Sequence, residues 1–232
     1  MEEFVTVDIR RGFTEVEQVF MDAARFGAFI CGGYARYCAS PLYKPVPASD
    51  VDVYCPSIEV FKETERFLKL EKKLEVRAEN EMAITFKHPS EGSYFYCPPV
   101  QLIKPVKKGQ VVAMGSMEEV LFNFDFTVIR AGILNDSYVL ADKDFLEDER
   151  KRILRIKKIH CPISSTLRCM KYSRKGYWLK PMEVIKLLTD WENRDDNYRM
   201  QIVDLLRKSA ADPKSGLTKE EVETLEALMR ID

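Results

Sequence analysis

The chain has 232 residues, of which 46% are hydrophobic and 31% are charged, as in a globular protein that buries a substantial core. It contains no apolar run close to the roughly 18–20 residues of a membrane-spanning helix, and its acidic, mixed start lacks the features of a secretory signal, so we expect a cytoplasmic protein. Its six cysteines include no CxxC pair and only two histidines accompany them, which argues against a structural zinc site and predicts buried thiols.

Positive charge is concentrated in one part of the chain, although the formal net charge is only −1. Residues 151–180, the basic stretch, hold ten of the 36 Lys and Arg residues and none of the 37 Asp and Glu residues. A solvated helix surface normally mixes both signs, so this separation indicates a face for RNA or for a polyphosphate.

The first elements are a helix, a short strand and a second helix. Thr14 and Glu17 have the spacing of a capping box, and apolar residues recur at helical spacing, so a helix is expected over residues 14–26. The following "AFIC" is typical of a short buried strand, and "GGYAR" is typical of a turn that opens another helix.

An alternating segment and three further strands come next. The segment "DVDVYC" (residues 50–55) alternates polar and apolar residues, as a half-buried strand does. Ser57 is a good cap for a helix that runs to Lys69. Further strands are expected over residues 74–78, 82–87 and 100–104.

A capped helix and a β-rich segment follow. Ser116 and Glu119 have capping-box spacing ahead of a short helix. The segment "FDFTVIRAGI" (residues 124–133) is rich in β-forming residues and predicts a strand.

From Asp144 onward the pattern is helical. Pro181 suits the first position of a helix, and Trp178 and Trp191 are expected to pack in the helical core. A last helix is expected over Thr218–Met229, and it either completes the core or mediates dimerisation, which leaves the oligomeric state open.

These elements predict an α+β protein with two domains. Residues 1–145 are expected to form a small mixed β-sheet domain, and residues 146–232 an all-helical one. A cleft between two such domains is a common place for a ligand.

Asp50 and Asp52 predict a magnesium site. They are two positions apart on an expected strand, so both side chains point to one face, about 7 Å apart. Two carboxylates this close repel each other unless a cation lies between them. Mg²⁺ binds through one or two carboxylates together with substrate phosphates, and two such ions can stabilise the attacking and leaving oxygens of a phosphoryl displacement.

Gly32 and Gly33 predict a phosphate site beside these acids. Paired glycines let the backbone turn sharply and approach a ligand closely. The helix that they open would present backbone N–H groups to a phosphate, and Arg36 would add a bidentate contact. The order strand, glycine pair, helix, loop and D-x-D strand is more specific than any one of these features.

These segments resemble the head and neck of tRNA nucleotidyltransferases and bacterial poly(A) polymerases, members of the DNA-polymerase-β-like nucleotidyltransferase superfamily. The family motif GG-x-V-R-D followed by D-x-D is similar to "GGYARY" and "DVDVY". Later matches are "NFDFTVIRA" to the family's RRDFT-I-N-A, "ADKDFLEDERKRILRI" to an aspartate-containing stretch before LR, and "LRCMKYSRKGY" to its LR-x-x-R-F segment. The resemblance covers roughly residues 28–177.

The resemblance implies a polymerase-β-like head and an Mg²⁺-dependent transfer of a nucleoside monophosphate from an NTP, such as ATP, to an acceptor hydroxyl, with release of pyrophosphate. Asp50 and Asp52 would hold the metal, and the basic stretch would bind RNA, with a tRNA-like 3′ end as the favoured acceptor in tRNA processing. The implied nucleotide-binding residues are Gly32, Gly33, Arg36, Arg168, Lys171 and Tyr172. Tyr172 and Tyr177 are the candidates for contact with a base or with RNA.

Asp125 is the candidate for a third catalytic carboxylate, because it is retained in "NFDFT" while the expected neighbouring strand carries Gln101 where an acid would serve. The alternative role for Asp125 is to cap or pair with a nearby basic group.

Two departures from the family pattern bear on the function. Ser164 and Ser165 replace acids that are linked to base choice, and Asn123 and Phe124 replace arginines that are linked to the ribose. They leave open a catalytically idle RNA- or partner-binding module on the same fold, or nucleotidyl transfer to a protein or a small molecule.

Overall fold

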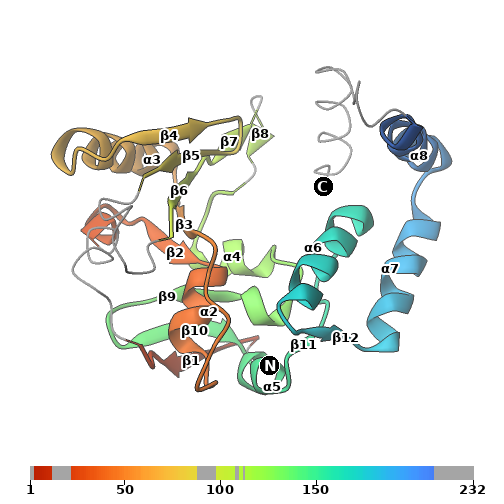
Figure 1. The fold of residues 1–232 in the computed structure, drawn as a ribbon. Coiled ribbons are helices and arrows are strands. Elements are labelled where there is room, and N and C mark those ends of the chain that lie inside the picture. The colour runs from red at the N-terminus through yellow and green to blue at the C-terminus, as the bar shows by residue number, and fades with distance from the viewer. Residues whose placement is uncertain (1–2, 12–21, 88–97, 108–109, 112, 212–232) are drawn as a thin grey trace. The chain divides into compact units, whose positions relative to one another are not determined.

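The chain forms two compact units, Met1–Lys151 and Arg152–Asp232 (Figure 1). The first carries a large sheet, and the second consists mostly of helices. The computed structural model describes residues 3–11, 22–87, 98–107, 110–111 and 113–211.

A mixed sheet of eight strands organises the first unit (Figure 1). In spatial order its strands are β1 (Phe4–Asp8), β10 (Tyr138–Asp142), β9 (Ala131–Ile133), β2 (Phe29–Cys31), β3 (Val51–Tyr54), β6 (Val100–Ile103), β5 (Ala83–Phe86) and β4 (Val76–Glu79). Among these strands β3 and β6 run parallel, and the other neighbours are antiparallel. The three strands expected between residues 74 and 104 are therefore confirmed. A separate hairpin joins β7 (Val106–Lys107) to β8 (Gln110–Val111).

Short helices surround this sheet. They are η1 (Asp22–Phe26), α2 (Gly33–Ala39), α3 (Ile58–Arg66), η2 (Phe67–Glu71), α4 (Met117–Phe122), η3 (Thr127–Ile129) and α5 (Phe145–Lys151). The first unit extends to the end of α5 because that helix packs on η3.

Different helices cover the two faces of the sheet, because side chains alternate along each strand. Val51 and Val53 of β3 are buried in the main core together with residues of α2. On the opposite face, Cys31 and the half-buried Tyr54 pack with residues of α4. Alternation places Asp52 on this second face.

Two of the three helix caps expected in this unit, at Ser57 and Ser116, are present. The Ser57 hydroxyl accepts a hydrogen bond from the Val60 N–H (3.3 Å). The helix expected to run to Lys69 is formed by α3 together with η2. At α4, the Ser116 hydroxyl accepts from the Glu119 N–H (3.3 Å), and the Glu119 carboxylate accepts from the Ser116 N–H (2.7 Å).

The strand expected over residues 124–133 is wrong in its first half. Thr127–Ile129 form the 3-10 turn η3, and only the last three residues pair in the sheet. The Thr127 hydroxyl donates to the buried carboxylate of Asp148 on α5 (2.7 Å). This tertiary contact overrides the local β preference of the segment.

The second unit contains α6 (Pro162–Arg174), α7 (Pro181–Asn193) and α8 (Asp196–Ala211). Pro181 occupies the start of α7, as expected. Trp191 packs against Tyr198 with ring centroids 6.4 Å apart.

The expectation of an all-helical second unit is wrong in one respect. Two short strands, β11 (Ile153–Leu154) and β12 (Trp178–Leu179), pair in parallel. Trp178 lies on β12 and is 49% exposed, so it is not part of a helical core. Its N–H donates to the Arg152 carbonyl (2.9 Å), and this bond draws the residue out of the helical pattern.

Two expected features fall outside the described residues. These are most of the 14–26 helix, with its capping box, and the whole of the Thr218–Met229 helix. The described end of the first, Asp22–Phe26, is a 3-10 helix. Of the helices that the structure describes, none combines the length and apolar character needed to cross a membrane.

Candidate functional site

The glycine bend, formed by Gly32 and Gly33, joins β2 to α2. Gly32 has a φ of +82°, a conformation that residues with side chains rarely adopt. Its N–H donates to the Ala131 carbonyl of β9 (2.8 Å), which fixes the bend to the sheet. A Cβ atom added at Gly33 would meet nothing within 4 Å, so the backbone there is open to a ligand.

Asp52 lies beside this bend. On β3 it is opposite Cys31, the residue that precedes Gly32. One carboxylate oxygen of Asp52, Oδ2, is 3.7 Å from the point where a Cβ of Gly32 would lie. Asp50 and Asp52 are both half-buried, whereas Val51 between them is buried in the core. Asp50 directly precedes β3, and its place on the same face as Asp52 stays a prediction.

Cys31 is buried and lies opposite Asp52 in the sheet. Burial raises the pKa of Cys31 well above its ordinary value, and the nearby negative charge of Asp52 raises it further. A raised pKa favours the protonated thiol.

The strand next to β3 carries an amide where a third acid would stand. Gln101 on the parallel strand β6 is in register with Asp52, as the sequence predicts. Asp125 lies in the loop between α4 and η3 and is 2% exposed. Its assignment as a third catalytic carboxylate stays a prediction.

Aromatic side chains border the bend on the side of Asp52. The Cε2 atom of Phe124 is 3.6 Å from the point where a Cβ of Gly32 would lie. The Phe124 ring is tilted against Tyr54 (centroids 5.8 Å apart), and Tyr54 stacks on Phe29 (6.3 Å). Sequence reasoning treated Phe124 only as the replacement for an arginine and missed this contact. The available signal was Tyr54, an aromatic residue two positions after Asp52 and therefore on the same face of β3.

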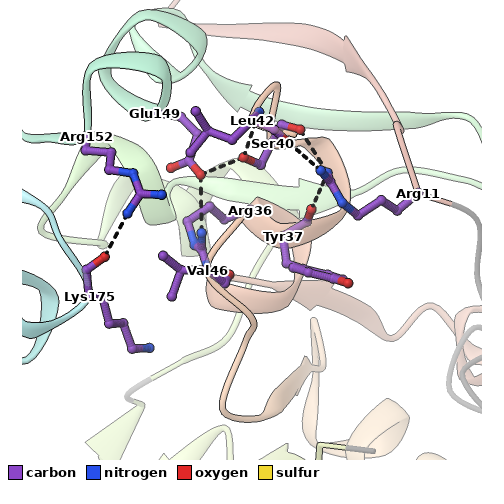
Figure 2. A network of polar contacts seen from close by, with 9 residues as sticks. All are labelled: Arg11, Arg36, Tyr37, Ser40, Leu42, Val46, Glu149, Arg152 and Lys175. Carbon is purple, nitrogen blue, oxygen red and sulfur yellow. Dashed lines mark hydrogen bonds and ion pairs between the residues drawn. The ribbon is translucent and has the colours of Figure 1, made fainter. Parts of the chain in front are cut away.

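Arg36 belongs to a buried network that Figure 2 shows. Its guanidinium donates to the Glu149 carboxylate (3.2 Å) and to the Val46 carbonyl (2.6 Å). The side chains of the ion pair are 1% and 0% exposed, and Glu149 also accepts from the Ser40 hydroxyl (2.7 Å). The geometry does not support the predicted phosphate contact of Arg36, because its guanidinium is buried against an acid of α5. It ties α2 to α5 and to the loop that follows α2.

Arg11 holds the start of the same loop (Figure 2). Its guanidinium donates to the carbonyls of Tyr37 (3.1 Å), Ser40 (2.8 Å) and Leu42 (2.6 Å). Carbonyls at the end of a helix have no intrahelical donors, and here the Arg11 guanidinium provides the missing N–H groups. Two arginines therefore hold the segment that leads from α2 towards Asp50.

Solved structures share this architecture. The chain matches the Thermotoga maritima CCA-adding enzyme complexed with tRNA-CCA over 99% of its own length, with a TM-score of 0.52 and 12% identity. It matches a CCA-adding enzyme in complex with CTP over 98% of its length, with a TM-score of 0.52 and 14% identity. The chain has the fold of the CCA-adding enzymes. It spans 66% and 56% of the length of those two proteins.

The likeness to CCA-adding enzymes is one of fold. No protein-family model matches the sequence, and no curated protein matches it significantly.

Asp52, at the glycine bend of this CCA-adding enzyme fold, suits one class of metal ion. Within the described ranges, no three His, Cys, Asp or Glu side chains gather around a common point. Asp52 offers a hard oxygen donor beside the open backbone of Gly33, and Asp50 precedes it by two residues. This donor set fits Mg²⁺, which takes one or two carboxylates and completes its shell with water and phosphate oxygens.

The predicted nucleotide-binding residues of the second unit lie on α6. Arg168 and Lys171 are exposed. Tyr172 is 8% exposed and packs edge-on against Tyr177, which is 2% exposed, with ring centroids 5.4 Å apart. The predicted contact of these two tyrosines with a base is not supported, because each ring is buried by packing within the unit.

Proposed function

We propose that the protein is a magnesium-dependent nucleotidyltransferase, which moves a nucleoside monophosphate from an NTP to the 3′ hydroxyl of an RNA and releases pyrophosphate. The observation that carries the proposal is the carboxylate of Asp52, which lies against the open glycine bend with Asp50 two residues before it. The fold is that of the CCA-adding enzymes, of which one is complexed with tRNA-CCA and another with CTP.

Each part of the candidate site has a role in this reaction. Gly33 lets the backbone approach the triphosphate, because no side chain stands in the way. Asp50 and Asp52 would hold Mg²⁺, which when bound neutralises phosphate oxygens and stabilises charge on the leaving pyrophosphate. Phe124 and Tyr54 form an apolar wall beside Asp52, which limits the access of water from that side.

The acceptor hydroxyl oxygen attacks the α-phosphorus in line with the bond to the bridging oxygen. That bond breaks, pyrophosphate leaves with its electron pair, and the hydroxyl proton passes to a carboxylate, for which Asp125 is the predicted candidate. The residues of the chain contribute positioning and electrostatic stabilisation, which supply most of the catalysis in phosphoryl transfer.

An RNA acceptor is proposed because of the basic stretch. It contains the exposed Arg168 and Lys171 and includes no acid. A cluster of cations in an otherwise acidic chain attracts the phosphates of a nucleic-acid backbone.

The test is pyrophosphate release from each NTP in the presence of Mg²⁺ and RNA, for the wild type and for Asp50→Asn/Asp52→Asn. Amides keep the shape of the side chains but remove the charges that hold the metal, so release should fall at least about 100-fold. Asp136→Asn, at an exposed acid of the same unit, is the matched control and should retain wild-type release. Equal release from the wild type and from the double variant would contradict the proposal.

The acceptor is identified by the fate of the label from an NTP labelled at the α-phosphate. We expect the label on RNA. Label on a protein or on a small molecule would support nucleotidyl transfer but would show that RNA is not the acceptor.

A second candidate function is an RNA-binding module without turnover. The burial of Arg36 favours it, as do Ser164 and Ser165 at positions where the family carries acids. RNA binding that weakens steeply with salt, without pyrophosphate release stimulated by Mg²⁺, would establish this alternative.

A further inference from the structure

Arg130 is a buried arginine directly before β9, and its exposed fraction is 1%. Its Nε donates to the Phe124 carbonyl (2.9 Å), and its Nη2 donates to the Phe122 carbonyl (2.7 Å). Both carbonyls lie at the end of α4, where a helix leaves carbonyls without intrahelical donors. The guanidinium therefore fixes the loop of residues 122–125, which carries Phe124 and Asp125.

The charge of Arg130 is balanced inside the protein. Its Nη1 lies 3.5 Å from a carboxylate oxygen of Asp142, whose side chain is fully buried. It also pairs with Glu3, which is 35% exposed. The guanidinium is thus held from one side by acids and directed at the two carbonyls on the other.

The residues that follow Arg130 contact the glycine bend. The Ala131 carbonyl accepts the hydrogen bond from the Gly32 N–H (2.8 Å), and Gly132 is opposite Cys31 in the sheet. One segment of three residues therefore contacts both the bend and, through the Arg130 side chain, the 122–125 loop.

Phe124 connects the Arg130 side chain to the surroundings of Gly32. Its carbonyl accepts from Arg130, and its ring edge and the Asp52 carboxylate lie 3.6 Å and 3.7 Å from the point where a Cβ of Gly32 would lie. A shift of the 122–125 loop would change the wall beside Asp52 and the place of Asp125.

We propose that Arg130 is a positioning residue of the candidate site, which sets the 122–125 loop against the glycine bend without touching the nucleotide or the metal. The inference rests on the proposed nucleotidyl transfer and adds to it a residue that acts through Phe124 and Asp125.

The first test is Arg130→Lys. A lysine keeps a charge near Asp142, but its compact ammonium cannot bond both carbonyls in the plane of a guanidinium. A small displacement of reacting groups is costly in rate, so kcat should fall about 10–100-fold. The KM for the NTP should stay within about threefold, because Arg130 makes no contact with it.

Two matched variants separate the carbonyl contacts from the charge. Glu3→Gln removes the partly exposed partner of Arg130 and leaves both carbonyl bonds, so kcat should stay within about twofold of the wild type. Arg25→Lys makes the same chemical change at an exposed arginine that pairs with Glu71, and it should have no effect. A loss in Glu3→Gln equal to that in Arg130→Lys would overturn the proposal.

Hydrogen exchange of backbone amides gives a readout that is independent of turnover. In Arg130→Lys the amides of residues 122–126 should exchange about tenfold faster, while those of α3 keep their wild-type rates. Unchanged exchange in residues 122–126, a uniform increase over the unit, or a rise in KM with kcat unchanged would each overturn the positioning role. If the wild type releases no pyrophosphate, the proposed function fails, and exchange alone decides whether Arg130 holds the loop.

If Arg130→Lys does not fold, Arg130→Gln/Asp142→Asn replaces the buried ion pair by a neutral one. The same changes in exchange and in kcat are expected from it, since the two carbonyls again lose the guanidinium. Wild-type values for this double variant would overturn the proposal.

Discussion

Three arginines of the first unit, Arg11, Arg36 and Arg130, donate hydrogen bonds to backbone carbonyls of the protein itself. The planar guanidinium offers five N–H donors in a fixed geometry, which suits the carbonyls left at helix ends. Lysine cannot replace it at such places. At the scale of single residues, arginine in this unit shapes the loops around the candidate site.

The Arg36–Glu149 pair leads to a prediction about stability. Arg36→Met would leave the Glu149 carboxylate buried without its cation, so the free energy of unfolding should fall by about 3–5 kcal/mol. Urea denaturation followed by circular dichroism measures the loss.

The double variant Arg36→Met/Glu149→Gln is the control. It removes both charges and keeps an acceptor for the Ser40 hydroxyl, so it should recover a large part of that stability. A loss below about 1 kcal/mol in the single variant would show that the pair is unimportant.

At the scale of elements, α4 is the helix that leads into the loop carrying Phe124 and Asp125. It begins at a capping box and ends at the carbonyls that Arg130 holds. Side chains therefore hold both ends of α4, and this also restrains the loop that follows the helix. A helix of six residues has little stability of its own and depends on such contacts.

The capping box of α4 gives a second stability prediction. Ser116→Ala removes the acceptor for the Glu119 N–H and should lower the free energy of unfolding by about 1 kcal/mol. Ser116→Thr retains a hydroxyl and should stay close to the wild type. An alanine variant as stable as the wild type in urea would show that the cap contributes nothing.

At the scale of the whole molecule, positive charge is distributed unevenly between the two units. The formal net charge is −1, yet nine of the ten cations of the basic stretch belong to the second unit and one, Lys151, ends the first. Uneven charge of this kind governs association with polyanions, and it says little about the fold.

The exposed cations of α6 give a prediction about RNA binding. Arg168→Glu/Lys171→Glu should weaken RNA binding and reduce the slope of log affinity against log salt by about 2, one for each lost phosphate contact. Arg207→Glu/Lys208→Glu reverses the same charge on α8, outside the basic stretch, and should change the slope less. Equal effects of the two double variants in fluorescence anisotropy would show that only net charge matters.

The sequence by itself determined the caps at Ser57 and Ser116 and the strands β2 to β6, but not β1, β10, β11 or β12. These features depend on the alternation of side chains and on hydrogen bonds between near neighbours, which a short window of sequence contains. The glycine turn between β2 and α2 was predictable for the same reason.

Only the tertiary structure decided what the charged and aromatic side chains contact. Arg36 pairs with Glu149, which is 113 residues further along the chain. Arg130 was missed because two of its partners are backbone carbonyls, which every residue type carries and no sequence motif marks. Whether such a side chain faces a ligand or the interior depends on segments that only folding brings together, and long-range packing therefore outweighs local pattern at these positions.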